Sequence, residues 1–437
     1  MSDNNRMILE ESTFVAAQEA RNKPGIVAGM SSPLSWEDFC ALPMPAREME
    51  DWRFATISGM RLGGFSLAGG VDENVAAGIV AGIGDNDEFA GTIVVADGLV
   101  VAKTLSDEAK SAGIVVATMA EIPPELREKV CGLVVATTEC EARDKIAGLH
   151  RAYALPTACL LYIPAGVRIE KPFAIHNRSV ADNGAAFPFL IVVAEENSAA
   201  KFAEFYFSDS GDNNALVVSR LAILAERGAC ISHELIQNLN AKTQFYRSEQ
   251  TIVATNADVR ATAINLGGKR ARTTTELRLA GDNADAELYS LSVATNAQEF
   301  DQRTIQRHAA TNSVSRLLFK NALFDKARTI FGGNIVVAEN AQKSNAVQSN
   351  KNLILSPDAT AHSLPGLEID ANDVHCSHGA TNGAIDPSQL FYLQQRGLPM
   401  EAARALLVRG FAEEIVATIP STTIANIARE LVDHKLG

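Results

Sequence analysis

The sequence predicts a mainly β protein, with a right-handed parallel β-helix core between an N-terminal helical or mixed region and a C-terminal helical segment. Three observations predict this fold. Residues 156–385 hold strand-like runs rich in Val, Ile, Leu, Thr and Phe, with almost no helical periodicity. A polar turn recurs among these runs at a nearly fixed interval, which is typical of a solenoid. Helix signals are clear only outside them. We therefore expect three regions, at 1–155, 156–385 and 386–437.

The recurring turn defines the length of one coil. Its copies begin at intervals of 30, 29, 27 and 29 residues, at Asn197, Arg227, Asn256, Asn283 and Asn312. Because no helix interrupts the interval, the pattern predicts a β-helix whose coils stack strand upon strand. Further turns at 339–341 and 356–359 follow at shorter spacing. We therefore expect the last coils to depart from the period.

The N-terminal region mixes helix and strand. An amphipathic helix is expected at 7–21, and another helical stretch at 139–151. Residues 91–102 predict a β-hairpin, because two apolar runs flank the turn dipeptide Asp97-Gly98. The charged segment 50–54 contains Trp52, which we expect to anchor a turn onto a neighbouring surface.

Three helices are predicted after the β-helix. Asp386 can cap the first, Pro387 suits its first turn, and Gly397 ends it. The second is expected at 399–416 and the third at 424–435. The apolar side of the second helix either packs on the chain's own core or presents a groove-binding surface to a partner.

Composition narrows the possible partners and compartment. The 437 residues carry a formal charge of −13, which argues against binding to a nucleic-acid backbone. No apolar stretch approaches the length of a bilayer span, and the N-terminus shows no signal-peptide core. The six cysteines are scattered without a CxxC pair, as expected for reduced thiols in a cytoplasmic protein.

The strongest candidate for chemistry is a short stretch near the end of the predicted β-helix. It places His375, Cys376 and His378 within four residues. If the stretch is a strand, alternation puts Cys376 and His378 on one face and His375 on the other. A thiolate beside an imidazole can bind a borderline-soft metal. The alternative is a small buried cysteine with a hydrogen-bonded histidine near a turn.

Common catalytic motifs are missing. The segment Gly267-Gly268-Lys269-Arg270 fails the phosphate-loop spacing, and Arg270 stands where a magnesium-binding Ser or Thr belongs. The chain contains no GxGxxG after a strand, no GxSxG elbow and no HExxH. The sequence therefore offers ligand-type residues on a rigid scaffold, without an assembled catalytic set.

Long ordered motifs in the second half of the chain resemble the SufB/SufD family of iron–sulfur cluster assembly proteins. The resemblance is strong from about 215 to 416, and it is carried by Arg328–Ile335, Gln348–Ser356, Leu364–Asp373, Cys376–Thr381 and Gln389–Gly397. The segment Glu50–Phe54 also resembles the family's N-terminal tryptophan motif. The family fold is a parallel β-helix with helical segments at both ends, which agrees with the repeat.

The resemblance implies a non-enzymatic scaffold in a complex with the paralogue SufB and the ATPase SufC. It implies that His378 contributes to iron, and to a transient iron–sulfur cluster, at the SufB interface, with Cys376 as a weaker candidate. SufC would dock on the C-terminal helices, for which the candidate contacts are Leu406, Leu407, Phe411 and Ile415. ATP would then bind to SufC and not to this chain. A homodimer is an option for the isolated chain.

Two departures from the family pattern matter. Family members often have Lys where this chain has His375, so His375 inherits no role. SufB carries a functional cysteine near the segment matching 348–355, and this chain has none there. The partner would therefore supply the sulfur ligand. Two competing classes are a β-helix carbohydrate enzyme with paired acids and a standalone metal-binding protein.

Overall fold

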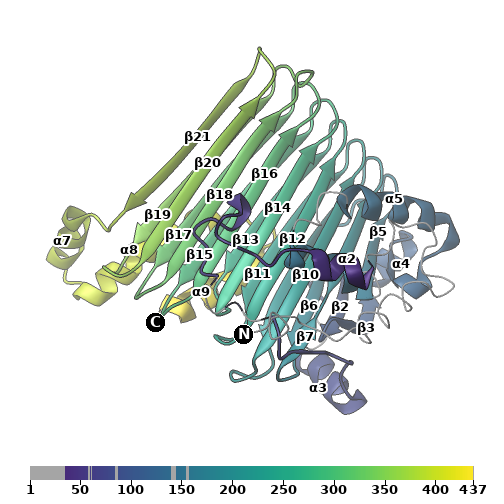
Figure 1. Ribbon diagram of the computed structural model, residues 1–437, viewed down its shortest axis with the longest axis horizontal. Coiled ribbons are helices and arrows are strands. Elements are labelled where there is room, and N and C mark those ends of the chain that lie inside the picture. The colour runs from purple at the N-terminus through teal and green to yellow at the C-terminus, as the bar shows by residue number, and fades with distance from the viewer. Residues whose placement is uncertain are drawn as a thin grey trace.

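The computed structural model describes residues 35–57, 60, 62–83, 87–138, 144–153 and 157–436, and its centre is a parallel β-solenoid of about eight turns (Figure 1). The predicted fold class is thereby confirmed. The helix expected at 7–21 lies outside the described residues, as do positions 139–143 of the stretch expected at 139–151. The three region boundaries stay predictions.

Successive strands of the solenoid alternate between two sheets. The eleven-stranded sheet contains β1 (Ser66–Leu67), β4 (Val115–Thr118), β5 (Ala158–Ile163), β7 (Gly184–Ala186), β8 (Phe189–Ala194), β10 (Ala215–Ala225), β12 (Gln244–Val253), β14 (Arg270–Leu279), β16 (Glu299–His308), β18 (Arg328–Val337) and β20 (Thr360–Ile369). The ten-stranded sheet contains β2 (Gly91–Ala96), β3 (Leu99–Leu105), β6 (Phe173–Ser179), β9 (Ala199–Ser208), β11 (Cys230–Asn238), β13 (Asp258–Asn265), β15 (Asp285–Ala294), β17 (Val314–Leu323), β19 (Asn345–Ile354) and β21 (His375–Gly383).

The predicted turns form a ladder along one side of the solenoid. Asn197, Asn256, Asn283 and Asn312 all have positive φ, between 54° and 59°, and Gly228 occupies the equivalent place at 68°. Glycine and asparagine adopt this left-handed conformation most readily among the residues, which explains the recurring Asn. The amide nitrogen of each left-handed residue donates to a carbonyl of the next coil, as Asn256 does to Asp282 at 2.9 Å.

The last coils keep the period, so the expected departure is wrong. Lys343 takes the left-handed position one coil after Asn312, with φ 61°, and its amide donates to the carbonyl of Asp373 at 2.5 Å. The turn that seemed early, at Asn340, lies just before this position and does not set the spacing. The strand pairs β18–β20 and β19–β21 are parallel and in continuous register.

Helices and short strands cover the first coils. The predicted hairpin is β2–β3, an antiparallel pair whose turn residues Asp97 and Gly98 have φ of 48° and 87°. Helix α5 (Arg127–Thr138) packs Val130 and Leu133 against the outer face of β5 and β8. The remaining elements before the solenoid are α2 (Trp36–Ala41), η2 (Glu50–Trp52), α3 (Glu73–Ile83), α4 (Asp107–Ser111), η3 (Met119–Glu121), η4 (Pro124–Leu126) and α6 (Lys145–Tyr153).

The three C-terminal helices occur where they were predicted. They are α7 (Pro387–Gln395), α8 (Met400–Val416) and α9 (Thr422–Leu436). The Asp386 carboxylate accepts a hydrogen bond from the Ser388 amide at 2.8 Å, which caps α7. Helices α8 and α9 pack on the outer face of the ten-stranded sheet and not over its last strand (Figure 1). Within the described residues, no helix is long and apolar enough to cross a membrane.

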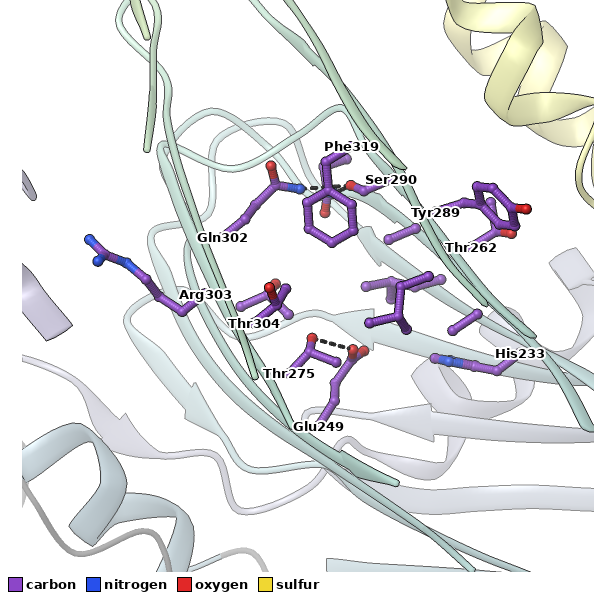
Figure 2. Close-up of a pocket in the computed structure, with 16 residues that line it drawn as sticks. His233, Glu249, Thr262, Thr275, Tyr289, Ser290, Gln302, Arg303, Thr304 and Phe319 are labelled. Atoms are coloured by element: carbon purple, nitrogen blue, oxygen red, sulfur yellow. Dashed lines mark hydrogen bonds between the residues drawn. The ribbon is translucent and has the colours of Figure 1, made fainter. Parts of the chain in front are cut away.

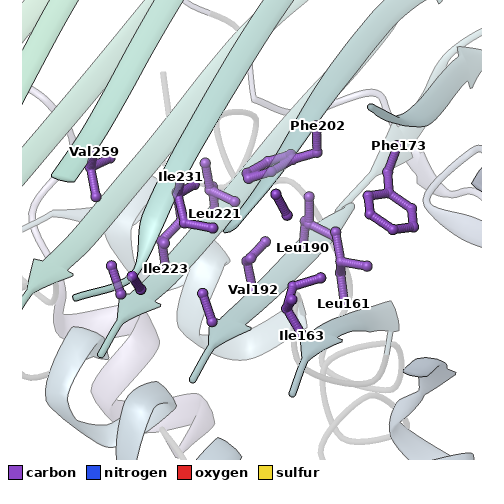
Figure 3. Close-up of a cluster of buried hydrophobic side chains, with 14 of the residues drawn as sticks. Leu161, Ile163, Phe173, Leu190, Val192, Phe202, Leu221, Ile223, Ile231 and Val259 are labelled. Atoms are coloured by element: carbon purple, nitrogen blue, oxygen red, sulfur yellow. The ribbon is translucent and has the colours of Figure 1, made fainter. Parts of the chain in front are cut away.

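The interior of the solenoid changes character along its axis. In the first coils, strands from both sheets contribute an apolar core that includes Leu161, Phe173, Leu190, Phe202 and Leu221 (Figure 3). In later coils the inward positions include many polar side chains, and those that are buried include Gln302, Thr304, Gln306, His308, Asn321, Gln348, Asn350 and Asn352. The predicted site stretch lies at the polar end.

Candidate functional site

Within the described residues, the C-terminal end of the solenoid is open. Strands β20 and β21 are the last of their sheets, and in the part of the chain that the structure describes each pairs on one side only, with β18 and β19. Figure 1 shows both at the outer margin of the solenoid. Leu367 and Ile369 of β20 are each 39% exposed, although the equivalent residues one coil earlier, Ile335 and Val337, are fully buried. This end therefore presents unpaired backbone and core-type side chains.

His378 and Cys376 face the interior of this last coil. The register of β19 with β21 pairs Cys376 with Ala346 and His378 with Gln348. Ala346 and Gln348 are buried inside the solenoid, at 0% and 1% exposure, so their neighbours on β21 lie on the same inward face. His375 pairs with exposed Asn345 on the opposite face. The predicted alternation of the three residues is confirmed.

The two inward side chains are of types that can bind a metal, but they do not make a complete site. Cys376 is half-buried against the apolar cluster that contains Val337 and Ala346, and burial raises the pKa of its thiol. The thiol is therefore protonated at neutral pH in this chain. His378 is exposed. Among the described residues, no group of three or more His, Cys, Asp and Glu is placed to hold a metal ion. Iron–sulfur clusters ordinarily take four protein ligands.

Asparagine side chains connect the coils up to the open end. The Asn321 side-chain amide donates to Asn352 Oδ1 at 2.7 Å, and that of Asn352 donates to Asn382 Oδ1 at 2.8 Å. Asn382 belongs to β21 and lies four residues after His378, on the same inward face. This ladder holds the last strand in register although nothing in the described chain covers it.

A second, enclosed cavity lies deeper in the solenoid (Figure 2). Thr275 Oγ1 donates to Glu249 at 2.9 Å, and Gln302 Nε2 donates to Ser290 at 2.7 Å, across its lining. Its free space of about 30 Å³ holds one or two water molecules and excludes a sugar ring. The cavity therefore gives no support to a carbohydrate enzyme.

A buried ion pair near this cavity was not predicted. Arg247 of β12 pairs with Glu204 of β9, and His233 of β11 lies 3.0 Å from the same carboxylate. Burial alone would raise the pKa of Glu204, but Arg247 beside it holds that pKa well below its usual range. Charged residues at inward positions of the strand alternation were the available signal. The three side chains thus connect β9 and β11 of one sheet with β12 of the other across the interior.

The four partner-binding candidates on α8 do not share one surface. Leu406 is 47% exposed and, with Leu407, lines a groove between α7 and α8. Phe411 is half-buried, and the Lys320 Nζ lies 3.9 Å from its ring centroid. Ile415 is fully buried against the ten-stranded sheet. Ile415 is therefore a core residue and not a contact, because the helix buries the face formed by Ala403, Val408, Ala412, Ile415 and Val416.

Trp52 anchors a segment that we call the strap, residues 50–57. Its indole Nε1–H donates to Asp144 Oδ2 at 2.6 Å, and the Arg272 guanidinium lies 3.8 Å from its ring centroid. At the other end of the strap, Phe54 stacks on His362 of β20 with 4.6 Å between the ring centroids. The strap thus lies across the outer face of the eleven-stranded sheet, as expected for an anchored turn.

These features define a class: a β-solenoid whose last coil, in the described part of the chain, presents an inward-facing histidine and cysteine beside unpaired strand edges. The family model described as "SUF system FeS cluster assembly, SufBD core domain" matches residues 176–411, more than half of the chain. The chain belongs to this SufBD family of iron–sulfur cluster assembly proteins. The family expected from the sequence is confirmed.

Named relatives extend the match over most of the chain. The chain is 27% identical to iron–sulfur cluster assembly protein SufD of Escherichia coli, over 86% of this chain and 85% of that protein. It is 26% identical to SufD of Bacillus subtilis, over 75% of both chains. It is also 25% identical to the chloroplastic protein ABCI7 of Arabidopsis thaliana, over 91% of this chain and 84% of that protein.

Proposed function

We propose that this chain is a non-catalytic scaffold subunit for iron–sulfur cluster assembly in the cytoplasm, working with a SufB-like paralogue and a SufC-like ATPase. The observation that carries the proposal is the inward-facing His378 at the open end of the solenoid. Family membership supplies the reaction, and this geometry supplies a site that a second subunit can complete.

The SufB-like partner joins this chain at the open end. The unpaired edges of β20 and β21 offer backbone hydrogen bonds to added strands, and Leu367 and Ile369 offer apolar area to bury. Closing this end places the partner's ligands opposite His378. Because this chain has no cysteine in 348–355 and Cys376 is half-buried, the sulfur ligands come mainly from the partner.

His378 binds iron through a ring nitrogen while the cluster forms. Imidazole is a suitable ligand for iron, and a ligand on an edge strand becomes accessible again when the two subunits shift. The cluster is the product and not a resident group. Dividing its ligands between two chains therefore favours release.

The SufC-like ATPase docks on the groove between α7 and α8, and this chain binds no ATP itself. Tyr392 and Leu406 line this groove and are 57% and 47% exposed, and Phe391, next to Tyr392 on α7, is 61% exposed, which suits a partner-facing surface. Glu414 of α8 accepts a hydrogen bond from the nearly buried Lys320 of β17 at 2.6 Å and lies 3.5 Å from Lys351 of β19. A movement of α8 is thereby coupled to the strand beside β21.

The test of the site is His378→Ala in the three-protein complex. We expect the complex to assemble normally, because the proposed contacts are the edges of β20 and β21 with Leu367 and Ile369, while the clusters formed anaerobically fall at least roughly tenfold, as for loss of a metal-site residue. Iron and sulfide analysis measures the yield. His375→Ala is the matched control, since His375 faces outward from the same strand. An unchanged yield in His378→Ala would refute the role.

Docking is tested by Leu406→Asp combined with Leu407→Asp. Two carboxylates in the apolar groove should weaken co-purification of the ATPase and leave pairing with the SufB-like partner intact. Val80→Asp is the control, because Val80 is a partly exposed apolar residue (37%) on helix α3. Unaltered ATPase binding would exclude the groove as the dock. Stoichiometric iron on the purified chain alone would instead favour a standalone metal-binding protein.

A further inference from the structure

Gln348 is a buried side chain whose hydrogen-bonding capacity is unused. It is 1% exposed, and among the residues that the structure describes neither its Oε1 nor its Nε2 has a hydrogen-bond partner. Leaving a buried polar group unpaired destabilises the folded chain, because the group loses its hydrogen bonds to water without replacement. A glutamine in such a place needs a reason beyond filling space, because a leucine or methionine would fill it at lower cost.

A glycine in the facing strand leaves the space that this amide occupies. A Cβ atom on Gly333, in the neighbouring sheet, would lie 2.1 Å from Gln348 Nε2 and 2.6 Å from the Phe331 ring. No residue with a side chain fits at position 333 while Gln348 keeps its place. The present position of the Gln348 amide therefore requires glycine at position 333.

Only one register neighbour of Gln348 can hydrogen-bond to it. In its inward column the neighbour on β17 is Leu317, and the neighbour on β21 is His378. Paired residues on adjacent strands are about 4.8 Å apart, so the His378 side chain extends from the neighbouring strand on the same inward face as Gln348. Across the interior, Gly333 pairs with Pro365, whose side chain has no polar atom, on the side of the open end, and with Thr304 on the side away from β20 and β21.

We infer that Gln348 is a positioning residue for His378: when a partner closes the open end, Gln348 Oε1 accepts the hydrogen bond of one ring N–H. This hydrogen bond fixes the tautomer and directs the other ring nitrogen at iron. Metal-binding histidines generally have such an outer partner. The inference rests on the proposed function, since it assigns the outer partner of the same ligand.

The test is Gln348→Met in the assembled complex, which keeps the shape of the side chain and removes its acceptor. Cluster yield should fall roughly tenfold, in the range seen for outer-partner losses. Pulsed EPR of the reduced cluster should show a changed histidine nitrogen coupling. In a map of the wild-type complex, the Gln348 amide should lie within about 3.2 Å of a His378 ring nitrogen.

Gln302→Met is the matched control. Gln302 is also an inward glutamine, 5% exposed with Oε1 unpartnered, but it lines the enclosed cavity two strands back in the other sheet. It should leave the yield and the nitrogen coupling unchanged. Gln348→Glu retains an acceptor and should keep the nitrogen coupling of the wild-type complex. It also tests the role if Gln348→Met fails to assemble.

The outcomes separate the two ideas. If His378→Ala lowers the yield and Gln348→Met behaves like Gln302→Met, the positioning role is wrong and the proposed function stands. A Gln348 amide bonded only to water or to other interior groups in the complex also overturns it. If His378→Ala has no effect, the proposed function itself fails.

Discussion

His150 is held neutral inside the protein. It lies on α6 at 4% exposure, and its Nε2 is 2.7 Å from the Ser219 carbonyl, to which it donates. Burial, followed by the nearby Arg220, lowers the pKa of His150 to about 3. The unfolded chain, whose histidines titrate near 6.5, therefore binds a proton that the folded chain does not between these two values.

We predict that His150→Gln flattens the pH dependence of stability. In the parent chain this residue lowers the unfolding free energy by up to about 1.4 kcal/mol per pH unit as pH falls below about 6.5. Glu234, whose pKa burial raises to about 7, contributes the opposite slope in both chains and cancels in the comparison. Urea unfolding at several pH values measures the difference. Equal slopes for the parent and His150→Gln chains would contradict the prediction.

Single residues were predictable where strand alternation alone decides their direction. His378, Cys376 and His375 followed the expected faces because a strand has a period of two. The Glu204–Arg247 pair was not predictable, since the partners come from β9 and β12 and meet only across the folded interior. Gln348 was part of a motif, but its unpaired amide depends on the space left by Gly333.

The turn ladder decides where each coil ends. Asn283 has φ 58°, and its side-chain amide donates to Asn256 Oδ1 in the preceding coil at 2.9 Å. We predict that Asn283→Val lowers the unfolding free energy by about 1–2 kcal/mol, because a β-branched residue is strained in the left-handed region. Asn283→Gly should cost less. Denaturant unfolding of both variants checks this, and equal losses would show that conformation at this turn is unimportant.

For helices, the sequence indicates position better than orientation. All three C-terminal helices were expected at nearly their observed bounds, since caps, Pro and Gly are local signals. The buried face of α8 was misjudged at Ile415. That face is set by Ala412 and Ile415 meeting strand residues such as Ile264 and Leu291, and this contact is tertiary.

The solenoid is asymmetric along its axis: among the residues that the structure describes, helices cover its first coils and none covers its last. We predict that the isolated chain associates with itself through the open end. Such an association would pair the free edges of β20 and β21 and would remove the Leu367 side chain from water. Leu367→Lys should keep the chain monomeric at concentrations where the parent dimerises, as measured by analytical ultracentrifugation.

The control for self-association is Val75→Lys, a comparable change at an exposed apolar position (40%) on α3. It should leave the association unchanged. If Leu367→Lys dimerises as readily as the parent chain, the open end is not the surface of self-association.

The strap has a consequence for how the protein is made. Thr56 contacts Glu299, 243 positions later in the chain, and Phe54 reaches His362 later still. At translation rates of about 5–20 residues per second, the strap emerges roughly ten seconds to a minute before its binding surface exists. Trp52 and Phe54 thus remain uncovered on the nascent chain while the coils form one after another. The strap is therefore synthesised before the coils but completes its contacts only after most of them have formed.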